Sequence, residues 1–338
     1  MFRRNAEIPV NQPIMSSDKV STGVSSRAEV QLDHSNILRL GDNTLTTVAS
    51  LSRTQIQVQV ARGLVDYTVF KGSEADVEIN TANVAIHPAQ KDGIYRVEVN
   101  SEGETQVIVR KGEAEISTPQ GSTHLEKGRM VIVRGTAEQA RYKEDEAPSK
   151  DSWDSWNNDR DRAIRDAQSW SHTNRYYVGS EDLDAYGRWD NVPDYGPVWV
   201  PAVSVGWAPY RSGRWVWEPG WGWTWVSDEP WGWAPYHHGR WFMYTSSWLW
   251  WPGPVYGYPR YRPAGCRSDR VTASTRGTGA MARASTRLTW STSRTSISTT
   301  GPAVASGASP RFAPETVIPT CVGPPWTRES VRGSRLFQ

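Results

Sequence analysis

Residues 206–241 read GWAPYRSGRWVWEPGWGWTWVSDEPWGWAPYHHGRW, and this stretch decides the architecture of the second half of the chain. The pentapeptide Gly-Trp-Ala-Pro-Tyr occurs at 206–210 and 232–236, and the tripeptide Gly-Arg-Trp at 187–189, 213–215 and 239–241, always 26 residues apart. Fourteen of the nineteen tryptophans lie between Trp189 and Trp251. A fixed period of about 20–50 residues indicates a duplicated supersecondary unit. Repetition favours architecture or binding over one catalytic centre.

Each repeat unit is predicted to be a two-stranded β-hairpin. The density of glycine and proline excludes long helices, whereas Trp, Tyr and Val favour strands. Residues 213–219 and 222–226 alternate with period two, which places both tryptophans of each segment on one face. We expect residues 176–263 to form a module of such hairpins, stacked into a small meander or barrel with a tryptophan core.

Upstream, residues 18–135 are predicted to be all-β. Apolar residues alternate with polar ones along short runs, and turn signals such as Lys71-Gly-Ser73 separate the runs. The alternating apolar sets are Ile56/Val58/Val60, Val65/Tyr67/Val69, Val77/Ile79, Tyr95/Val97/Val99, Val107/Val109 and Met130/Ile132. This pattern is typical of a β-sandwich or a β-roll, and residues 1–17 would be a lead-in to it.

Residues 149–171 are predicted to form an amphipathic linker helix. Ser149 or Ser152 would cap it, and Asp151 and Asp154 suit the positive end of its dipole. Apolar residues recur at steps of three and four and would dock on a neighbouring domain. This stripe consists of Trp153, Trp156, Ala163, Ile164, Ala167 and Trp170.

The charge is distributed unevenly along the 338 residues. Lys and Arg number 18 against 20 Asp and Glu in residues 1–150, 10 against 13 in 151–263, and 10 against 3 in 264–338. A mildly acidic balance before residue 264 argues against nucleic-acid binding there. The composition of residues 264–338 predicts a disordered, low-complexity tail. A frameshift near codon 263 is a sharper hypothesis, because the aromatic texture stops there.

Two interpretations of the aromatic repeat stay open. In the structural one, Trp189, Trp215 and Trp241 build a core, and Arg188, Arg214 and Arg240 lie across indole rings. In the functional one, exposed rings offer flat faces to sugars, proline-rich peptides or polyamines. The candidates for such a surface are Trp221, Trp231, Trp248, Trp250 and Trp251, most of which have no tryptophan 26 residues away.

The sequence contains no strong signal for catalysis, metal binding or a cofactor. It has no phosphate loop, no GxSxG elbow and no HExxH motif. His237 and His238 are adjacent, so on a strand they would point to opposite faces. Cys266 and Cys321 form no metal-ligand pattern. No apolar run of about 18 residues predicts a membrane helix, and no apolar signal-peptide core follows Met1.

Two families resemble parts of this chain. Asp18–Val30, Ile37–Thr44, Gly63–Tyr67, Lys111–Ile116 and Leu125–Gly128 resemble the strands of the FecR-type domain over residues 10–135. Tyr176-Tyr177, Leu183–Trp189 and both Gly-Trp-Ala-Pro-Tyr blocks resemble a bacterial Tyr/Trp/Pro-rich repeat family of unknown function over residues 176–263. The pair implies an exported bacterial protein of the periplasm or cell surface and implies no catalytic residue.

From this resemblance we expect a non-catalytic scaffold or binding module of the envelope, with a cell-wall glycan or an envelope protein as its partner. The alternative is a regulatory sensor in which the FecR-like domain signals to a membrane or sigma-factor system, and an uncharacterised envelope enzyme ranks third. FecR-type domains usually follow an export signal and a further strand pair, so the start at Met1 is expected to be truncated or mis-assigned.

Overall fold

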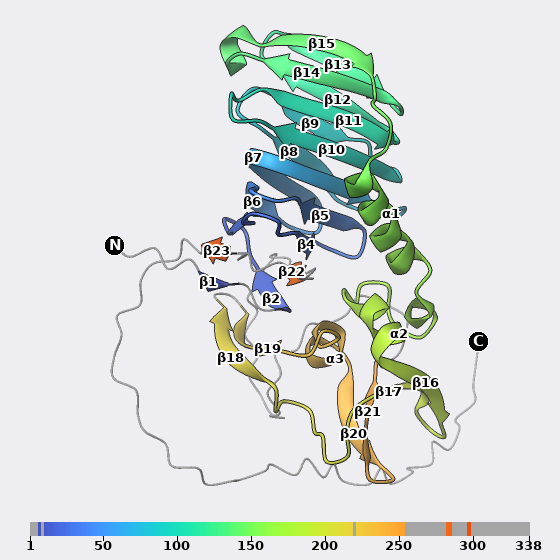
Figure 1. Ribbon diagram of the computed structural model, residues 1–338. Coiled ribbons are helices and arrows are strands. Elements are labelled where there is room, and N and C mark those ends of the chain that lie inside the picture. Colours follow the sequence, from blue (N-terminus) through green and yellow to red (C-terminus); the bar gives the residue numbers. More distant parts are fainter. Residues whose placement is uncertain (1–5, 8–9, 219–220, 254–281, 286–295, 299–338) are drawn as a thin grey trace, which may run out of the picture. The chain divides into compact units, whose positions relative to one another are not determined.

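The computed structural model describes residues 6–7, 10–218, 221–253, 282–285 and 296–298 (Figure 1). These residues are mostly in strands, with a few short helices, which confirms the expected mainly-β class. In the first half of the chain the strands are β1 (Ala6–Glu7), β2 (Gln12–Ile14), β3 (Lys19–Ser21), β4 (Ala28–Gln31), β5 (Asn36–Leu40), β6 (Leu45–Leu51), β7 (Gln55–Val69), β8 (Asp76–Asn80), β9 (Ala85–Pro88), β10 (Gly93–Val99), β11 (Thr105–Lys111), β12 (Glu113–Thr118), β13 (Gly121–Glu126), β14 (Arg129–Arg134) and β15 (Arg141–Glu146).

The long strand β7 belongs to two layers of this β domain. Its first half pairs with β6 and β8, and its second half pairs with β5 and β10. The change falls at Gly63, where φ is +89° and a Cβ would overlap Thr44. One layer runs β3-β6-β7-β8-β9-β12-β13, and the other runs β4-β5-β7-β10-β11-β14-β15. The sheet therefore rolls around one core.

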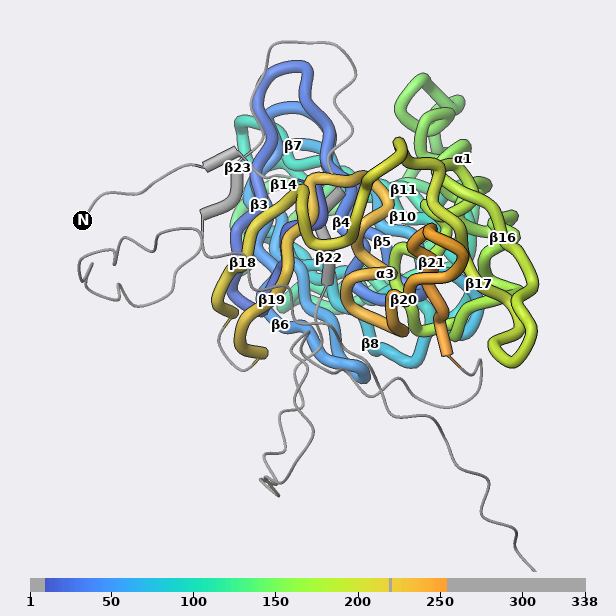
Figure 2. Tube along the Cα trace, turned by 90° about the horizontal axis from the view of Figure 1, so that it is seen from below, coloured from blue at the N-terminus to red at the C-terminus, as the bar shows by residue number. Residues whose placement is uncertain are grey.

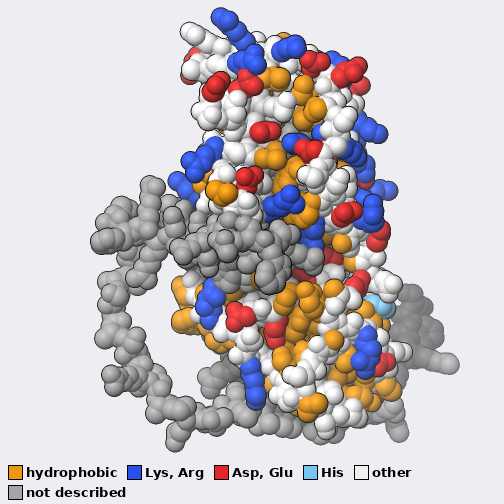
Figure 3. All heavy atoms as spheres, viewed as in Figure 1, with side chains coloured by type: hydrophobic (Ala, Val, Ile, Leu, Met, Phe, Trp, Pro, Cys, Tyr) orange, Lys and Arg blue, Asp and Glu red, His pale blue; other side chains and the backbone are white. Residues whose placement is uncertain are grey.

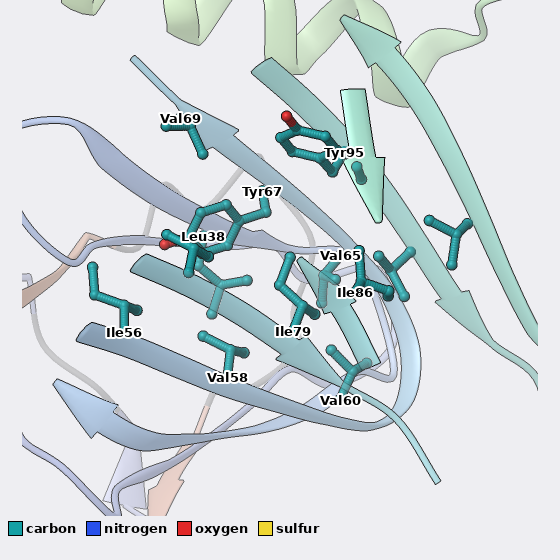
Figure 4. Close-up of a cluster of buried hydrophobic side chains, with 14 of the residues drawn as sticks. Leu38, Ile56, Val58, Val60, Val65, Tyr67, Val69, Ile79, Ile86 and Tyr95 are labelled. Carbon is teal, nitrogen blue, oxygen red and sulfur yellow. The ribbon is translucent and has the colours of Figure 1, made fainter. Parts of the chain in front are cut away.

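Side chains from both layers fill that core (Figure 4). Five of the six alternating sets predicted from the sequence are buried here, Ile56, Val65 and Tyr95 among them. The sixth set is wrong, because β14 turns Val131 and Val133 inward and leaves Met130 and Ile132 half-buried. All four of these residues are apolar, so alternation alone could not choose between the two faces. Pairing with β11 decides it, since Val131 lies opposite the buried Val107.

The predicted linker helix is α1 (Ser152–Arg165), followed by a short 3₁₀ turn, η2 (Gln168–Ser171). Asp151 caps it in a capping box with Asp154, so neither predicted serine is the cap. The expected apolar stripe is only partly right, since Ala163 is exposed while Trp153 and Ile164 are buried. The rest of the buried face is polar, consisting of Asp154, Asn157 and Asp161. Charged partners on the β domain account for this difference.

Each 26-residue unit of the repeat module is a hairpin, as predicted. The hairpins are β16–β17 (Gly187–Val192 and Gly196–Pro201), β18–β19 (Gly213–Glu218 and Gly222–Ser227) and β20–β21 (Arg240–Tyr244 and Ser247–Trp251). They do not stack in chain order as a meander or barrel. The first and third hairpins join through β17 and β21, whereas the second forms its own two-stranded sheet (Figure 2). Short helices η3 (Ser180–Asp182), α2 (Leu183–Tyr186) and α3 (Trp233–His237) lie between these elements.

The turn lengths set the register of the repeat. Three residues separate the paired strand ends in the first two hairpins, but only Thr245 and Ser246 do so in the third. Both have positive φ, as in a type I′ turn. This shorter turn moves the second strand by one residue, so Trp250 takes the place of Trp199 and Trp225. Each hairpin thus carries one inner cross-strand tryptophan pair, namely Trp189–Trp199, Trp215–Trp225 and Trp241–Trp250.

The glycine of each Gly-Arg-Trp lies against the second tryptophan of that inner pair. A Cβ on Gly187, Gly213 or Gly239 would come within 2.5–2.8 Å of the indole of Trp199, Trp225 or Trp250, respectively. Real Cβ atoms do not approach other atoms so closely. The tripeptide therefore repeats because glycine leaves space for the paired ring.

Most of the predicted tail, residues 264–338, lies outside the described residues, as do both cysteines and the proposed frameshift point. Two short segments of it are described, and both are strands rather than the disordered chain expected from composition. They are β22 (Ala282–Ser285), which pairs with β2 and β4, and β23 (Ser296–Ser298), which pairs with β1 and β3.

Candidate functional site

A row of alternating charges crosses one face of the β domain. Glu29 on β4, Arg39 on β5, Asp66 on β7 and Arg96 on β10 are direct cross-strand partners in that order. We call these four residues the charge ladder. They alternate with core residues along each strand, so their side chains leave the opposite face of the sheet. Helix α1 covers this face, and Arg39 is fully buried as a result.

Helix α1 is held on the charge ladder by ion pairs. The Arg39 guanidinium donates to Glu29 and to Asp161 of the helix, each at 2.7 Å, with all three side chains at least 95% buried. Arg160 of the helix also donates to Glu29. Near the N-terminus of the helix, Asp154 accepts from Arg110 of β11 at 2.8 Å.

We call the charge ladder together with its partners on α1 the clasp, and further polar contacts complete it. Arg96 pairs with both Asp151 and Asp154, and Thr68 donates to Asp161. Buried ion pairs gain little over an apolar interface, but removing one partner leaves an uncompensated charge and costs about 3–5 kcal/mol. Opening any one of these ion pairs is therefore costly.

Asp66 has an unusual environment within the clasp. Burial raises the pKa of Asp66 to about 7, the carboxylates of Asp161 and Asp154 add to the rise, and Arg39 opposes it. Its Oδ1 accepts from Thr68 at 3.3 Å, whereas no described residue bonds its buried Oδ2. Glu29 behaves oppositely, because Arg39 and Arg160 overcome the effect of burial and hold its pKa well below the ordinary range.

The C-terminal end of α1 connects to the repeat module. Trp170 packs with Ile164 and with Ile37 and Phe70 of the β domain. In the same turn, Ser169 donates to Asp184, which precedes the first hairpin. Trp189 of that hairpin donates to the Ser169 hydroxyl at 2.9 Å. The α1–η2 segment is thus attached to both domains.

The aromatic core of the module lies between the hairpins and α3. Trp199 and Trp250 are fully buried, and Trp225, Trp231 and Tyr236 nearly so. Assigning Trp231 and Trp250 to the surface was therefore wrong. Trp250 lies outside the 26-residue spacing only because the third turn is one residue shorter. Trp231 contacts Trp199 with ring centroids 4.9 Å apart and fills the centre of the cluster.

The remaining predicted tryptophans and arginines differ in how far they are buried. Trp189 and Trp241 pack against the core while partly exposed, but Trp215 is 42% exposed and is not a core residue, although its cross-strand partner Trp225 is. Trp221, Trp248 and Trp251 are half-buried, and a binding role for them stays a prediction. Of the three arginines, Arg240 lies 5.1 Å from the ring of Trp251, as expected for packing. Arg214 instead donates to Gln12, and Arg188 is exposed.

The residues with the most exposed rings were missed in the sequence. Trp217 is 62% exposed and Trp223 is 57% exposed. They form the outer cross-strand pair of the second hairpin, with ring centroids 5.7 Å apart in an edge-to-face arrangement. On the face shown in Figure 3, hydrophobic side chains gather over the repeat module, whereas charged ones are spread over the β domain. Neither tryptophan recurs 26 residues away, since Asn191 and Met243 replace Trp217 and Pro197 and Leu249 replace Trp223. The break in spacing could therefore have singled out this pair as well, and the strand register shows that the two rings are partners.

Glu229 is a second residue that the sequence did not single out. Its carboxylate accepts from the indole of Trp207, the hydroxyl of Ser227 and the phenol of Tyr236, all at 2.7–2.8 Å. It fixes three segments of the module around the core. Such a partner cannot be chosen from spacing, because the acidic residue has no counterpart in the preceding repeat.

The two adjacent histidines serve packing. Burial lowers the pKa of His237 to about 4 and that of His238 to about 3, so both are neutral at pH 7. His237 stacks on Trp233, and His238 stacks on Tyr177. Within the described ranges, no three His, Cys, Asp or Glu side chains are grouped so that they could hold a metal ion. No helix in the described part of the chain combines the length and apolar character needed to cross a bilayer.

Comparison with known proteins identifies two domains. Residues 18–115 match the FecR protein family, and residues 180–271 match a family of unknown function, DUF6600. The chain therefore carries a FecR domain followed by a DUF6600 domain, which confirms the resemblance. The whole charge ladder and Arg110 lie inside the FecR match.

The solved structures similar to this chain include two that are each described as a putative anti-sigma factor from Parabacteroides distasonis. The first, at 1.65 Å resolution, has 15% identity and a TM-score of 0.33, covers 38% of this chain and has 59% of its own length covered. The second, at 2.50 Å, has 15% identity, a TM-score of 0.34 and coverages of 51% and 74%. No curated protein matches the chain.

Proposed function

We propose that this protein is a non-enzymatic regulatory sensor of the FecR type, exposed to the periplasm or the cell exterior. The FecR match supports regulation more than the passive scaffold that the aromatic repeats alone favour. In this proposal the repeat module receives a signal by binding, and the FecR domain passes it to a membrane-associated or sigma-factor partner.

The observation that carries the proposal is the attachment of α1–η2 to both domains. Ion pairs of the clasp fix the helix on the FecR domain, and Asp184 and Trp189 fix its end to the repeat module. Binding that moved the first hairpin would pull on η2. Because a buried ion pair resists partial opening, the pull would either be absorbed in the module or release the helix and uncover the charge ladder. A two-state element of this kind is what a switch requires.

The experiment compares transcripts of the native bacterium carrying the wild-type gene, a deletion, or Asp161→Asn. Asp161→Asn removes one helix charge from the clasp and leaves Arg39 buried beside a neutral amide, so it should favour release of the helix. We expect the deletion and Asp161→Asn to change the same small set of transcripts in a dose-dependent manner. Cell fractionation of the wild-type protein would locate it outside the cytoplasm.

Lys143→Met is the matched control, because its ion pair with Asp145 is solvent-exposed on β15. This variant should leave transcription unchanged. The regulatory proposal is wrong if the deletion changes no transcripts although the wild-type strain makes the protein and exports it normally. The scaffold function would then be the better explanation.

A further inference from the structure

The outer cross-strand pair differs among the three hairpins. The inner pair is Trp–Trp in every hairpin, as expected for a residue set that the fold requires. At the next paired position outward, the first hairpin has Asn191 and Pro197, and the third has Met243 and Trp248. Only in the second hairpin of the described module are both residues tryptophans, Trp217 and Trp223. The fold does not demand two indoles there, since the other two hairpins form without them.

These rings extend one exposed aromatic face. Trp215 lies on the same face as Trp217, two residues earlier on β18, and Tyr210 is parallel to Trp215 with an interplanar angle of 6°. We call Tyr210, Trp215, Trp217 and Trp223 the aromatic face. Tyr210 is 37% exposed, and a tryptophan side chain presents up to about 250 Å². The three exposed indoles together thus offer roughly 400 Å² of apolar surface.

The size of the aromatic face limits what can cover it. A stable protein interface, including a dimer of this chain, buries about 800 Å² on each partner. The exposed indoles supply about half of that area. A small or extended chain-like ligand fits this area better than a folded partner does.

The charge of the face narrows the chemistry further. Arg214 and Glu218 alternate with the tryptophans along β18, so they point to the other side of the hairpin. The strand positions that share the aromatic face are glycine, serine and tryptophan. With no charged side chain among these strand positions, the face offers no ion-pair partner to an anion or a cation. Its polar groups are indole N–H donors, which suit hydroxyl and ether oxygens.

We propose that the aromatic face of the second hairpin binds an uncharged oligosaccharide. A pyranose ring has one face made largely of C–H groups, which packs flat on an indole, and hydroxyls at its rim that accept hydrogen bonds. Trp215 and Trp217 follow each other along one face of β18, and Trp223 adds a ring edge to face with Trp217, so more than one sugar of a chain can contact the face. This proposal does not depend on the regulatory role, because a scaffold protein could bind a glycan through the same site.

The test is calorimetric titration of the full-length protein with chitohexaose and with cellohexaose, together with tryptophan emission. We expect saturable binding of at least one hexasaccharide in the micromolar to millimolar range. Trp217→Ala and Trp223→Ala should each weaken it by about tenfold. Both side chains are mostly exposed, so circular dichroism should show folded variants.

Met243→Ala is the matched control, because Met243 is the counterpart of Trp217 in the third hairpin and is 54% exposed. It should bind the glycan as the wild type does. Three results would overturn the proposal: no saturable binding of either glycan, equal binding by Trp217→Ala and wild type, or loss by Trp217→Ala of binding to a decaproline peptide in place of the glycans. Each of these leaves the transcript experiment unaffected, so failure here is distinguishable from failure of the regulatory proposal.

Discussion

At the residue scale, Asp66 makes the stability of the FecR domain depend on pH. It lies between Arg39 and Arg96 on the sheet and faces Asp161 and Asp154 of α1. The unfolded carboxyl ionises near pH 4, but burial keeps the folded one protonated up to about pH 7. Between these values the unfolded state binds fewer protons, so stability falls as pH rises and then levels off above pH 7.

This environment predicts the behaviour of Asp66→Asn. A separation of about three pKa units corresponds to at most about 4 kcal/mol, and the wild type should lose stability of this order between pH 4 and pH 7. An amide cannot ionise, so the variant should show a flatter profile over that window. Urea unfolding at pH 5, 6, 7 and 8 measures it. The control variant Asp145→Asn, on exposed β15, should show the same pH dependence of the free energy of unfolding as the wild type. If Asp66→Asn also shows that dependence, Asp66 does not titrate in this range.

At the element scale, the hairpin turns decide which tryptophans belong to the core. The 26-residue spacing pairs Trp225 with Trp251, but the two-residue turn at Thr245 and Ser246 brings Trp250 opposite Trp241 instead. A shift of one residue moves every side chain of a strand to the other face. This is why Trp250 is fully buried while Trp251 is half-buried.

Alanine substitution of Trp250 and Trp251 tests whether the observed strand pairing or the 26-residue spacing gives the core residue. Trp250→Ala removes a fully buried ring and should lower the free energy of unfolding by about 3–5 kcal/mol. Trp251→Ala loses a hydrogen bond to the Tyr195 carbonyl and the contact with Arg240, and should cost only about 1–2 kcal/mol. Chemical denaturation followed by near-ultraviolet circular dichroism compares them. A larger cost for Trp251 would support the spacing register over the structural one.

At the scale of the whole molecule, two sets of contacts join the FecR domain to the repeat module. One runs through the clasp and η2, and the other is direct, since Tyr176 donates to Glu74 and Asn11 donates to the Ser227 carbonyl. No tryptophan precedes Trp153, so tryptophan emission reports on α1 and on the part of the chain that follows it. Far-ultraviolet circular dichroism is dominated by the strands of both. If α1 couples the domains, the two signals should change together in the wild type.

Arg39→Met tests this coupling. It leaves Glu29 and Asp161 without their shared buried partner and should cost about 3–5 kcal/mol. We expect the two unfolding transitions to separate, with tryptophan emission changing at lower urea. Lys143→Met should keep them coincident. Coincident transitions in Arg39→Met would mean that the domains are coupled by other contacts.

Local pattern, read from the sequence alone, determined the mainly-β class, the helix after residue 149 and the hairpin in each 26-residue unit. Alternation, capping and glycine spacing depend on residues close together in the chain, so they can be recognised in the sequence. The resemblance to FecR rested on segments that include Glu29, Arg39 and Asp66. Their role was not visible, because the α1 residues that they face lie far away in the sequence, 122 residues from Arg39 and 131 residues from Glu29.

Only the tertiary structure decided which tryptophans are core and which are exposed, and which face of the helix is buried. Trp217 and Trp250 look alike in sequence, yet Trp250 packs inside the aromatic core and Trp217 is 62% exposed. Asp161 looks like a solvent-facing residue until Arg39 is placed beneath it. Burial and pairing depend on elements that meet through folding, and a one-residue change in a turn is enough to redirect them.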